Sequence, residues 1–205
     1  MGETILDPCA ESAPFYEGQA SFELTEITFQ TSIGTYLDAP THRFEERRDI
    51  AELRLDEVVL DAVVVRISTA KAGEAVTLNS FTLPSDKRGK AVLFHFGWDR
   101  HWGTDQSETY PFLGRDVIDA IVEAGAKLVG MDTFNADDRS DPARPAHTEF
   151  LSRNILIVEN LTNLGDLPDK PFRFFAVPIK AKGAAAMTIR AFAETPGGGI
   201  GRANE

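Results

Sequence analysis

The period of the hydrophobic positions changes several times along this chain and divides it into predicted strands and helices. Four mainly apolar runs are typical of strands buried within a sheet. These runs lie at 58–67, 89–98, 126–132 and 155–160. The run at 89–98 ends at Gly97. Between it and the next run, residues 114–125 have the spacing of an amphipathic helix closed by Gly125, with apolar side chains at Val117, Ile118, Ile121 and Val122.

The two ends of the chain are richer in strand signals than its middle. Residues 20–40 alternate apolar and polar side chains and predict strands that end at Pro40. Residues 172–193 predict two closing strands, and residues 147–154 a short helix. Strands alternating with helices predict the α/β class. We expect a single domain over residues 1–194, followed by a Gly-rich tail at 195–205.

Composition narrows the classes of partner. The 205 residues include 32 acidic and 21 basic side chains, and the formal charge is −11. This balance disfavours nucleic acid and anionic membrane surfaces as partners. No apolar run approaches the roughly 18 residues of a membrane helix, and no secretory signal is evident, so we expect a cytoplasmic protein. Cys9 is the only cysteine and is expected to be a structural thiol.

One segment gathers chemically active side chains. Residues 32–42 read S-I-G-T-Y-L-D-A-P-T-H, and Pro40 favours an extended backbone before it. In an extended chain alternate residues share a face. If the whole segment is extended, one face therefore carries a hydroxyl, a phenol, a carboxylate and an imidazole, from Ser32, Tyr36, Asp38 and His42.

A second candidate group lies further along the chain. His147 follows Arg144-Pro145-Ala146, and Glu159 comes twelve residues later at the end of an apolar run. Each of these groups also has an ordinary structural interpretation. Asp38 is consistent with a turn and Glu159 with a solvated strand end. Of the remaining histidines, His95 is expected in the core and His101 in a loop.

Together these residues resemble the cyclase-family metal hydrolases, which include bacterial kynurenine formamidase and isatin hydrolase. The family signature H-x-G-T-H-x-D-x-P-x-H is similar to S-x-G-T-Y-x-D-x-P-x-H over 32–42. The later His and Glu of the family match His147 and Glu159. The segments AVLFHFGW and AKLVGMDTFNADD resemble its strand–Gly–Trp and strand–Asp segments, and PFYEG at 14–18 its Pro–aromatic–Gly turn.

The resemblance implies the family's swivelling β/β/α fold, a homodimer and a metal-dependent site. It implies one divalent metal ion, Zn²⁺ or Mn²⁺, bound by Asp38, His147 and Glu159. Two-metal members use both signature histidines for a first metal, whereas this chain has Ser32 and Tyr36 there, and a hydroxyl and a neutral phenol are poor ligands. The non-ligand catalytic histidine matches His42.

The resemblance also implies hydrolysis of an amide or formamide C–N bond, in an N-formylkynurenine-type or a cyclic substrate. The metal would activate water and His42 would act as general base and then acid. The substrate would contact the side chains at the matched positions, Tyr16, Ser32 and Tyr36. Two alternatives remain at this point. One is a metal-free cyclase- or lyase-type enzyme that uses His42, Asp38 and Tyr36. The other is a non-catalytic protein that binds a small molecule.

Overall fold

A computed structural model describes residues 3–7, 24–84 and 87–195 of the chain. Its main element is an eight-stranded sheet with the strand order β11-β3-β9-β8-β6-β4-β10-β12. The strands are β3 (Tyr36–Asp38), β4 (Val59–Arg66), β6 (Ala91–His95), β8 (Leu128–Met131), β9 (Leu156–Glu159), β10 (Phe172–Phe175), β11 (Ala186–Thr188) and β12 (Phe192–Glu194). The predicted α/β class is confirmed.

The four central strands, β4, β6, β8 and β9, are parallel to one another. Almost every side chain of β6, β8 and β9 is buried, as their continuous apolar runs predict. The strands outside this centre are antiparallel: β3 pairs with β9 and β11 with β3, while β10 pairs with β4 and β12 with β10. The sheet thus has a parallel core with antiparallel edges.

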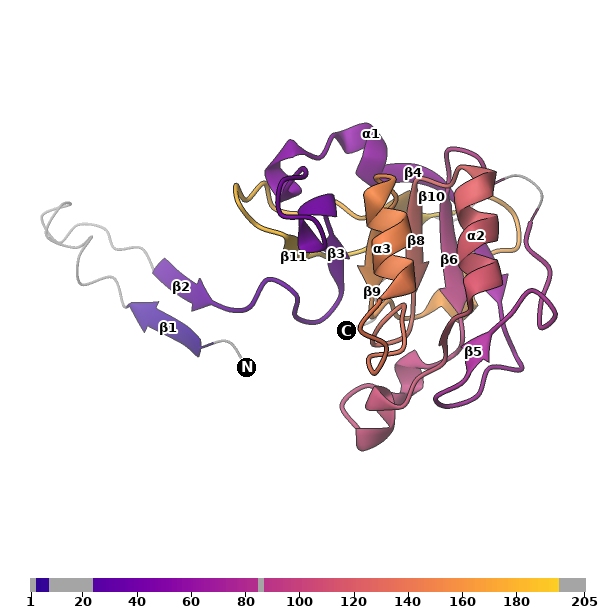
Figure 1. The fold of residues 1–205 in the computed structure, drawn as a ribbon. Coiled ribbons are helices and arrows are strands. Elements are labelled where there is room, and N and C mark those ends of the chain that lie inside the picture. The colour runs from indigo at the N-terminus through magenta and orange to yellow at the C-terminus, as the bar shows by residue number, and fades with distance from the viewer. Residues whose placement is uncertain (1–2, 8–23, 85–86, 196–205) are drawn as a thin grey trace, which may run out of the picture.

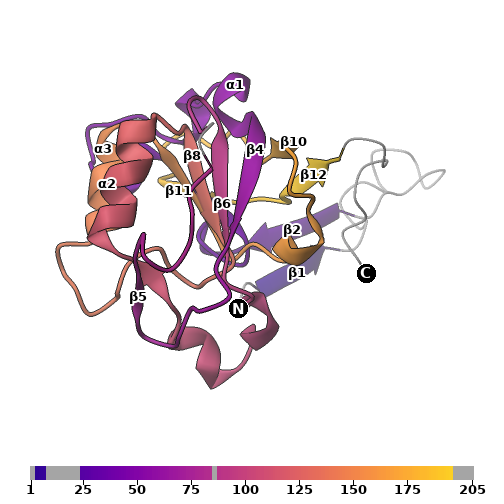
Figure 2. The ribbon, with the colours of Figure 1, turned by 90° about the vertical axis from the view of Figure 1, so that its right-hand side faces the viewer.

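Two helices cover one face of this sheet. Helix α2 (Arg115–Ala124) connects β6 to β8, and α3 (Pro145–Ser152) connects β8 to β9. Figure 1 shows them side by side, and Figure 2, with the sheet nearly edge-on, shows both on the same side. Helix α2 buries Val117, Ile118 and Ile121, and it ends at Gly125 with a left-handed φ of 70°, as the sequence predicts.

Hydrophobic clusters fill both faces of the sheet. On the helical face, Phe94 and Met131 of the sheet pack with Ile118 of α2 and Phe150 of α3. The opposite face is covered by loops and buries side chains such as Leu93, Leu128 and Phe174. Because both faces are covered, the polar groups at the strand ends are held by a rigid scaffold.

The remaining elements are short. Helix α1 (Leu55–Val58) precedes β4, so the predicted strand at 58–67 begins one residue later than expected. Single 3-10 turns lie at Pro40–His42, Ile50–Glu52, Asp99–His101, Asp105–Glu108 and Leu164–Asp166. Two small parallel strands, β5 (Ala75–Val76) and β7 (Phe112–Leu113), pair with each other. Among the helices of the described ranges, none has the length and apolar character needed to cross a membrane.

The N-terminal strands form a separate small sheet. Strand β1 (Glu3–Asp7), which the sequence pattern does not predict, pairs antiparallel with β2 (Leu24–Thr28). Figure 1 shows this two-stranded sheet standing apart from the main sheet. Cys9, Tyr16 and nearly all of the Gly-rich tail lie outside the described residues, so the domain limits stay a prediction.

Candidate active site

Asp38 lies at the centre of the candidate site. It ends β3, next to β9, in the register that places Tyr36 opposite Glu159. Its side chain is fully buried. Neither carboxylate oxygen accepts a hydrogen bond from any residue that the structure describes. Burying a carboxylate without a hydrogen-bond donor is costly, so these two oxygens indicate a site for a cation.

His42 approaches Asp38 through a turn. After Asp38 the chain forms the 3-10 turn Pro40–His42, in which the His42 backbone N–H donates to Ala39 O at 2.8 Å. This turn brings His42 Nδ1 to 3.7 Å from Asp38 Oδ1. The imidazole remains 38% exposed. His42 is therefore a part of the site that solvent can reach.

The expectation of one extended face over residues 32–42 is wrong at both of its ends. Tyr36 and Asp38 share a face of β3, but Ser32 is exposed in a turn before the strand and His42 lies in the 3-10 turn after it. Gly34 has a left-handed φ of 64°, which ends the extended path. No hydrogen bond within the described part of the chain joins Ser32 to the site.

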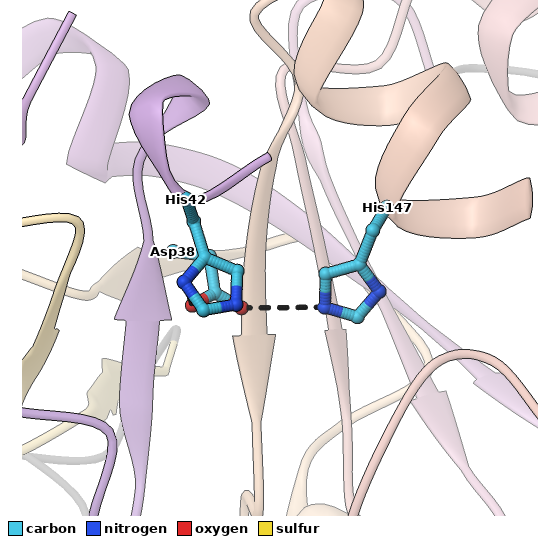
Figure 3. Close-up of side chains that lie close together, drawn as sticks. All are labelled: Asp38, His42 and His147. Atoms are coloured by element: carbon cyan, nitrogen blue, oxygen red, sulfur yellow. Dashed lines mark ion pairs between the residues drawn. The ribbon is translucent and has the colours of Figure 1, made fainter. Parts of the chain in front are cut away.

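His147 faces Asp38 from the other side. It lies in the first turn of α3 and its side chain is only 4% exposed. Its Nε2 is 3.7 Å from Asp38 Oδ2 and 3.6 Å from Glu159 Oε1. Figure 3 shows the two imidazoles coming from separate elements, with the Asp38 carboxylate reaching toward both. The ring centroids of His42 and His147 are 5.8 Å apart.

Asp137 holds His147 in this orientation. Its Oδ2 lies 2.7 Å from His147 Nδ1 and also accepts the His147 backbone N–H at 3.1 Å, and its Oδ1 accepts the Ala146 N–H at 2.6 Å. The carboxylate thus caps α3 and turns Nε2 toward Asp38 and Glu159. Burial opposes ionisation of Asp137, but its hydrogen bonds with His147 and Ala146 outweigh burial and lower its pKa.

The same contacts act on His147. Burial works to lower the pKa of His147, but the hydrogen bond with Asp137 and the nearby carboxylates of Asp38 and Glu159 raise it to about 10. The imidazole is therefore charged at neutral pH when only the protein groups surround it. A cation that binds Nε2 must displace this proton.

Glu159 is fully buried at the end of β9 and is held by three donors. Oε1 accepts the Ala136 backbone N–H at 2.8 Å, and Oε2 accepts from Tyr36 Oη and from Asn135 Nδ2. Burial and the nearby charge of Asp38 raise the pKa of Glu159. The charge of His147 and the hydrogen bonds with Tyr36 and Ala136 act to lower it, but their effect is smaller. Burial and the charges of Glu159 and Asp38 raise the pKa of Tyr36, so its phenol stays neutral. Oε1 keeps a lone pair on the side of His147.

These positions suit one metal ion. Ligand atoms that surround an ion at about 2.1 Å lie roughly 3 to 4 Å from one another. The contacts of His147 Nε2 with Asp38 and Glu159, at 3.7 and 3.6 Å, are in this range. Asp38, His42 and His147 also offer ligand atoms that all lie within 4.8 Å of one another. Asp38 and His147 belong to both sets of candidate ligands. The two sets differ in the third ligand, which is Glu159 in one and His42 in the other.

Sequence reasoning missed the groups that support these side chains. Asn135 and Asp137 follow β8, and Arg144 precedes α3. One signal could have located the first two. They belong to a polar segment directly after a buried strand, and the carboxyl ends of parallel strands are common positions for binding sites. Of the predicted site residues, the structure brings together Asp38, His42, His147, Glu159 and Tyr36.

Comparison with known proteins identifies a family that this chain matches. Residues 5–138 match the sequence pattern of the family described as "Putative cyclase". The chain is 27% identical over 165 residues to the kynurenine formamidase of Erythrobacter litoralis, covering 80% of this chain and 74% of that protein. It is 28% identical over 176 residues to the kynurenine formamidase of Salinibacter ruber, covering 85% and 81%.

Solved structures with the same fold include two isatin hydrolases. An isatin hydrolase bound to the product analogue thioisatinate superposes with a TM-score of 0.76 at 19% identity, covering 95% of this chain and 82% of that one. Isatin hydrolase A from Ralstonia solanacearum gives a TM-score of 0.77 at 19% identity, covering 93% and 81%. At this identity the likeness establishes the fold, and the expected swivelling β/β/α architecture is confirmed.

Proposed function

This chain belongs to the cyclase family, and from that membership we propose that it hydrolyses the amide or formamide C–N bond of a small molecule with the help of one divalent metal ion. One observation carries the proposal. The fully buried Asp38 carboxylate has no hydrogen-bond donor among the described residues and lies between two imidazoles. The kynurenine formamidases similar to this chain support the type of bond.

We propose that Asp38, His147 and Glu159 hold the ion. The mixed nitrogen and oxygen donors suit Zn²⁺ or Mn²⁺. When bound, such an ion lowers the pKa of an adjacent water and polarises a carbonyl group. Asp137 keeps His147 Nδ1 protonated and its Nε2 free for the ion. The donors on Glu159 fix its carboxylate and leave Oε1 facing His147.

His42 is proposed as the general base and then the general acid. Its Nδ1 lies beside Asp38 Oδ1, while His147 lies beside Oδ2 of the same carboxylate. Asp38 can therefore orient the His42 ring with one oxygen and bind the ion with the other. Because His42 is 38% exposed, it can take a proton from water and return it to the leaving nitrogen.

One ion, rather than two, fits the residues on the other side of Asp38. Tyr36 occupies the position of a first-metal histidine in the family signature, and its phenol donates to Glu159. Ser32, at the other such position, is exposed in the preceding turn. Since the Tyr36 proton is already engaged, the phenol is a weak candidate for the oxyanion donor of a metal-free mechanism. We further propose that the substrate is of the N-formylkynurenine type, which would give the protein a part in tryptophan catabolism. We also propose that Tyr16 contacts this substrate and that the protein is cytoplasmic.

Metal content and activity on aryl formamides test the proposal together. Purified protein equilibrated with Zn²⁺ or Mn²⁺ and then desalted should retain about one equivalent of metal by elemental analysis. Replacing the buried ligand in His147→Ala should remove both metal and hydrolysis. His42→Ala should keep the metal and lower kcat by about 100-fold or more, in the range expected for loss of a proton carrier.

Other outcomes would redirect the proposal. Metal loss in His42→Ala together with retention in Glu159→Gln would make His42 the third ligand. Two tightly held equivalents in the unmodified protein would contradict the single site. If the unmodified protein hydrolysed the substrates without taking up metal, the metal-free enzyme would be favoured. If it neither took up metal nor hydrolysed them, the non-catalytic binding protein would be favoured.

A further inference from the structure

Arg144 has an unusual place beside the site. It is the residue before α3 and adopts a left-handed backbone conformation, with φ 47° and ψ 60°. This conformation is uncommon for a residue with a side chain, and the following Pro145 restricts the backbone further. Such strain persists where the surrounding structure requires a particular placement. The Arg144 side chain is three-quarters buried, with 25% of its surface exposed.

The guanidinium of Arg144 is held by two groups of the site. Its Nη2 donates to Asn135 Oδ1 at 2.8 Å, and its Nε lies 3.7 Å from Asp137 Oδ2. Asn135 in turn donates to Glu159, and Asp137 contacts His147. The guanidinium is therefore one residue removed from two of the three proposed metal ligands, Glu159 and His147.

Most N–H donors of the Arg144 side chain have no acceptor among the residues that the structure describes. Only one of its N–H donors is engaged by an acceptor within the described ranges, and the contact of Nε with Asp137 is too long for a hydrogen bond. A guanidinium presents its donors in a planar fork that matches a carboxylate in a bidentate manner. The partial exposure of Arg144 leaves a route for such a group to reach it.

The charge of the site makes this cation significant. Asp38, Asp137 and Glu159 are fully buried acids. They would repel an anionic substrate unless a positive group received its charge. An ion between Asp38 and His147 would act at the scissile bond, whereas the guanidinium of Arg144 is joined to the site through Asn135 and Asp137. Arg144 is thus placed to receive a second, distant group of the substrate.

We propose that Arg144 determines specificity by binding a carboxylate of the substrate. This inference rests on the proposed C–N bond hydrolysis and deepens it, since it restricts the substrate class to amides or formamides that carry a carboxylate away from the scissile bond. Arg144 touches the substrate and takes no part in proton transfer. The competing explanation is structural: Arg144 would only tie Asn135 and Asp137 together.

A matched set of probes separates these explanations. Formanilide lacks a carboxylate, and 2-, 3- and 4-formamidobenzoate add one at different positions. Dissociation constants are measured by ligand-observed NMR in EDTA, so that carboxylate binding to a metal does not contribute. The protein should bind at least one formamidobenzoate roughly 10- to 100-fold more tightly than formanilide, as expected for a charge-assisted pair.

Arg144→Gln should abolish this preference and leave the formanilide dissociation constant and the metal affinity unchanged. Arg144→Lys, which keeps the charge but not the fork, should retain part of the preference and serves if Arg144→Gln does not fold. Arg153→Gln is the matched control, because Arg153 lies at the far end of α3 and pairs with Glu149. It should behave as the unmodified protein.

Three results would overturn the inference: no preference for any carboxylate isomer in the unmodified protein, an unchanged preference in Arg144→Gln, or an equal loss for all probes accompanied by weaker metal binding. The last result is the one expected of a purely structural role. Hydrolysis of the same probes with metal restored is scored separately. Selective binding without hydrolysis would refute the proposed function and leave the carboxylate site standing.

Discussion

Asp137 provides the sharpest test of how the site is built, because its carboxylate does two tasks at once. It accepts the backbone N–H groups of Ala146 and His147 at the start of α3, and it contacts His147 Nδ1 at 2.7 Å. Asp137→Asn keeps the size of the side chain but replaces one acceptor oxygen with an NH₂ group. The amide cannot accept from both the helix N–H groups and Nδ1.

The magnitude follows from these contacts. Loss of a helix cap costs about 0.5–2 kcal/mol, and loss of a charged acceptor costs about 1.5–3 kcal/mol. Because Asn keeps one oxygen, we expect the free energy of unfolding to fall by roughly 1–3 kcal/mol. Metal affinity should fall about 10- to 100-fold, since Nδ1 loses the charged partner that fixes its proton and the ring orientation.

Urea unfolding and competition with a fluorescent chelator measure the two effects. Asp138→Asn is the matched control, because Asp138 is the next residue and its carboxylate accepts from Ser140 in an exposed turn. Asp138→Asn should leave metal affinity unchanged. If Asp137→Asn bound metal as tightly as the unmodified protein, His147 would not depend on this carboxylate for its orientation, and the proposed ligand role of His147 would lose its structural basis.

Three further predictions concern pH, packing and assembly. Burial acts to lower the pKa of His147, but the hydrogen bond with Asp137 and the nearby carboxylates of Asp38 and Glu159 raise it to about 10, so an ion must displace a proton. Apparent metal affinity should therefore rise with pH, by up to about tenfold per unit, and level off above about pH 10 in a chelator titration. Gly114→Ala places a Cβ 2.6 Å from the backbone oxygen of Val76, so the midpoint of urea unfolding should fall by an amount that corresponds to about 1–3 kcal/mol; an unchanged midpoint would show that β5 can move aside. Light scattering should give about twice the chain mass of 22.5 kDa, because the two-stranded sheet of β1 and β2 stands apart from the main sheet and such a sheet alone is marginally stable in water; a monomer at micromolar concentration would contradict the expected homodimer.

The centre of the fold could be predicted because burial on both faces leaves a clear record in sequence. The runs that form β6, β8 and β9 are apolar throughout, and the helical spacing of α2 is bounded by Gly125. Strand β1 left no such record, since it pairs with β2 in a small sheet. The one-turn helix α1 was missed because four residues are too few to show a helical period.

The candidate site was predictable as a set of residues and less so as a geometry. Periodicity places Tyr36 and Asp38 on one face, and β3 confirms that part. It cannot indicate that the chain turns after Ala39, which brings His42 back toward Asp38. Nor does spacing connect Asp137 with His147, because their contact depends on the loop between β8 and α3.

The two histidines of the site differ in burial more than in chemistry, and this difference supports the roles that we propose for them. Both approach Asp38 at 3.7 Å, one at each oxygen. His147 is 4% exposed and fixed through Nδ1 by Asp137, so its ring is held for a bound ion. His42 is 38% exposed at the end of a single turn, so it can exchange protons with water. A buried, oriented imidazole suits a ligand and an exposed one suits a proton carrier. We propose that Asp38 serves both, because neither of its oxygens is engaged by a hydrogen-bond donor within the described residues.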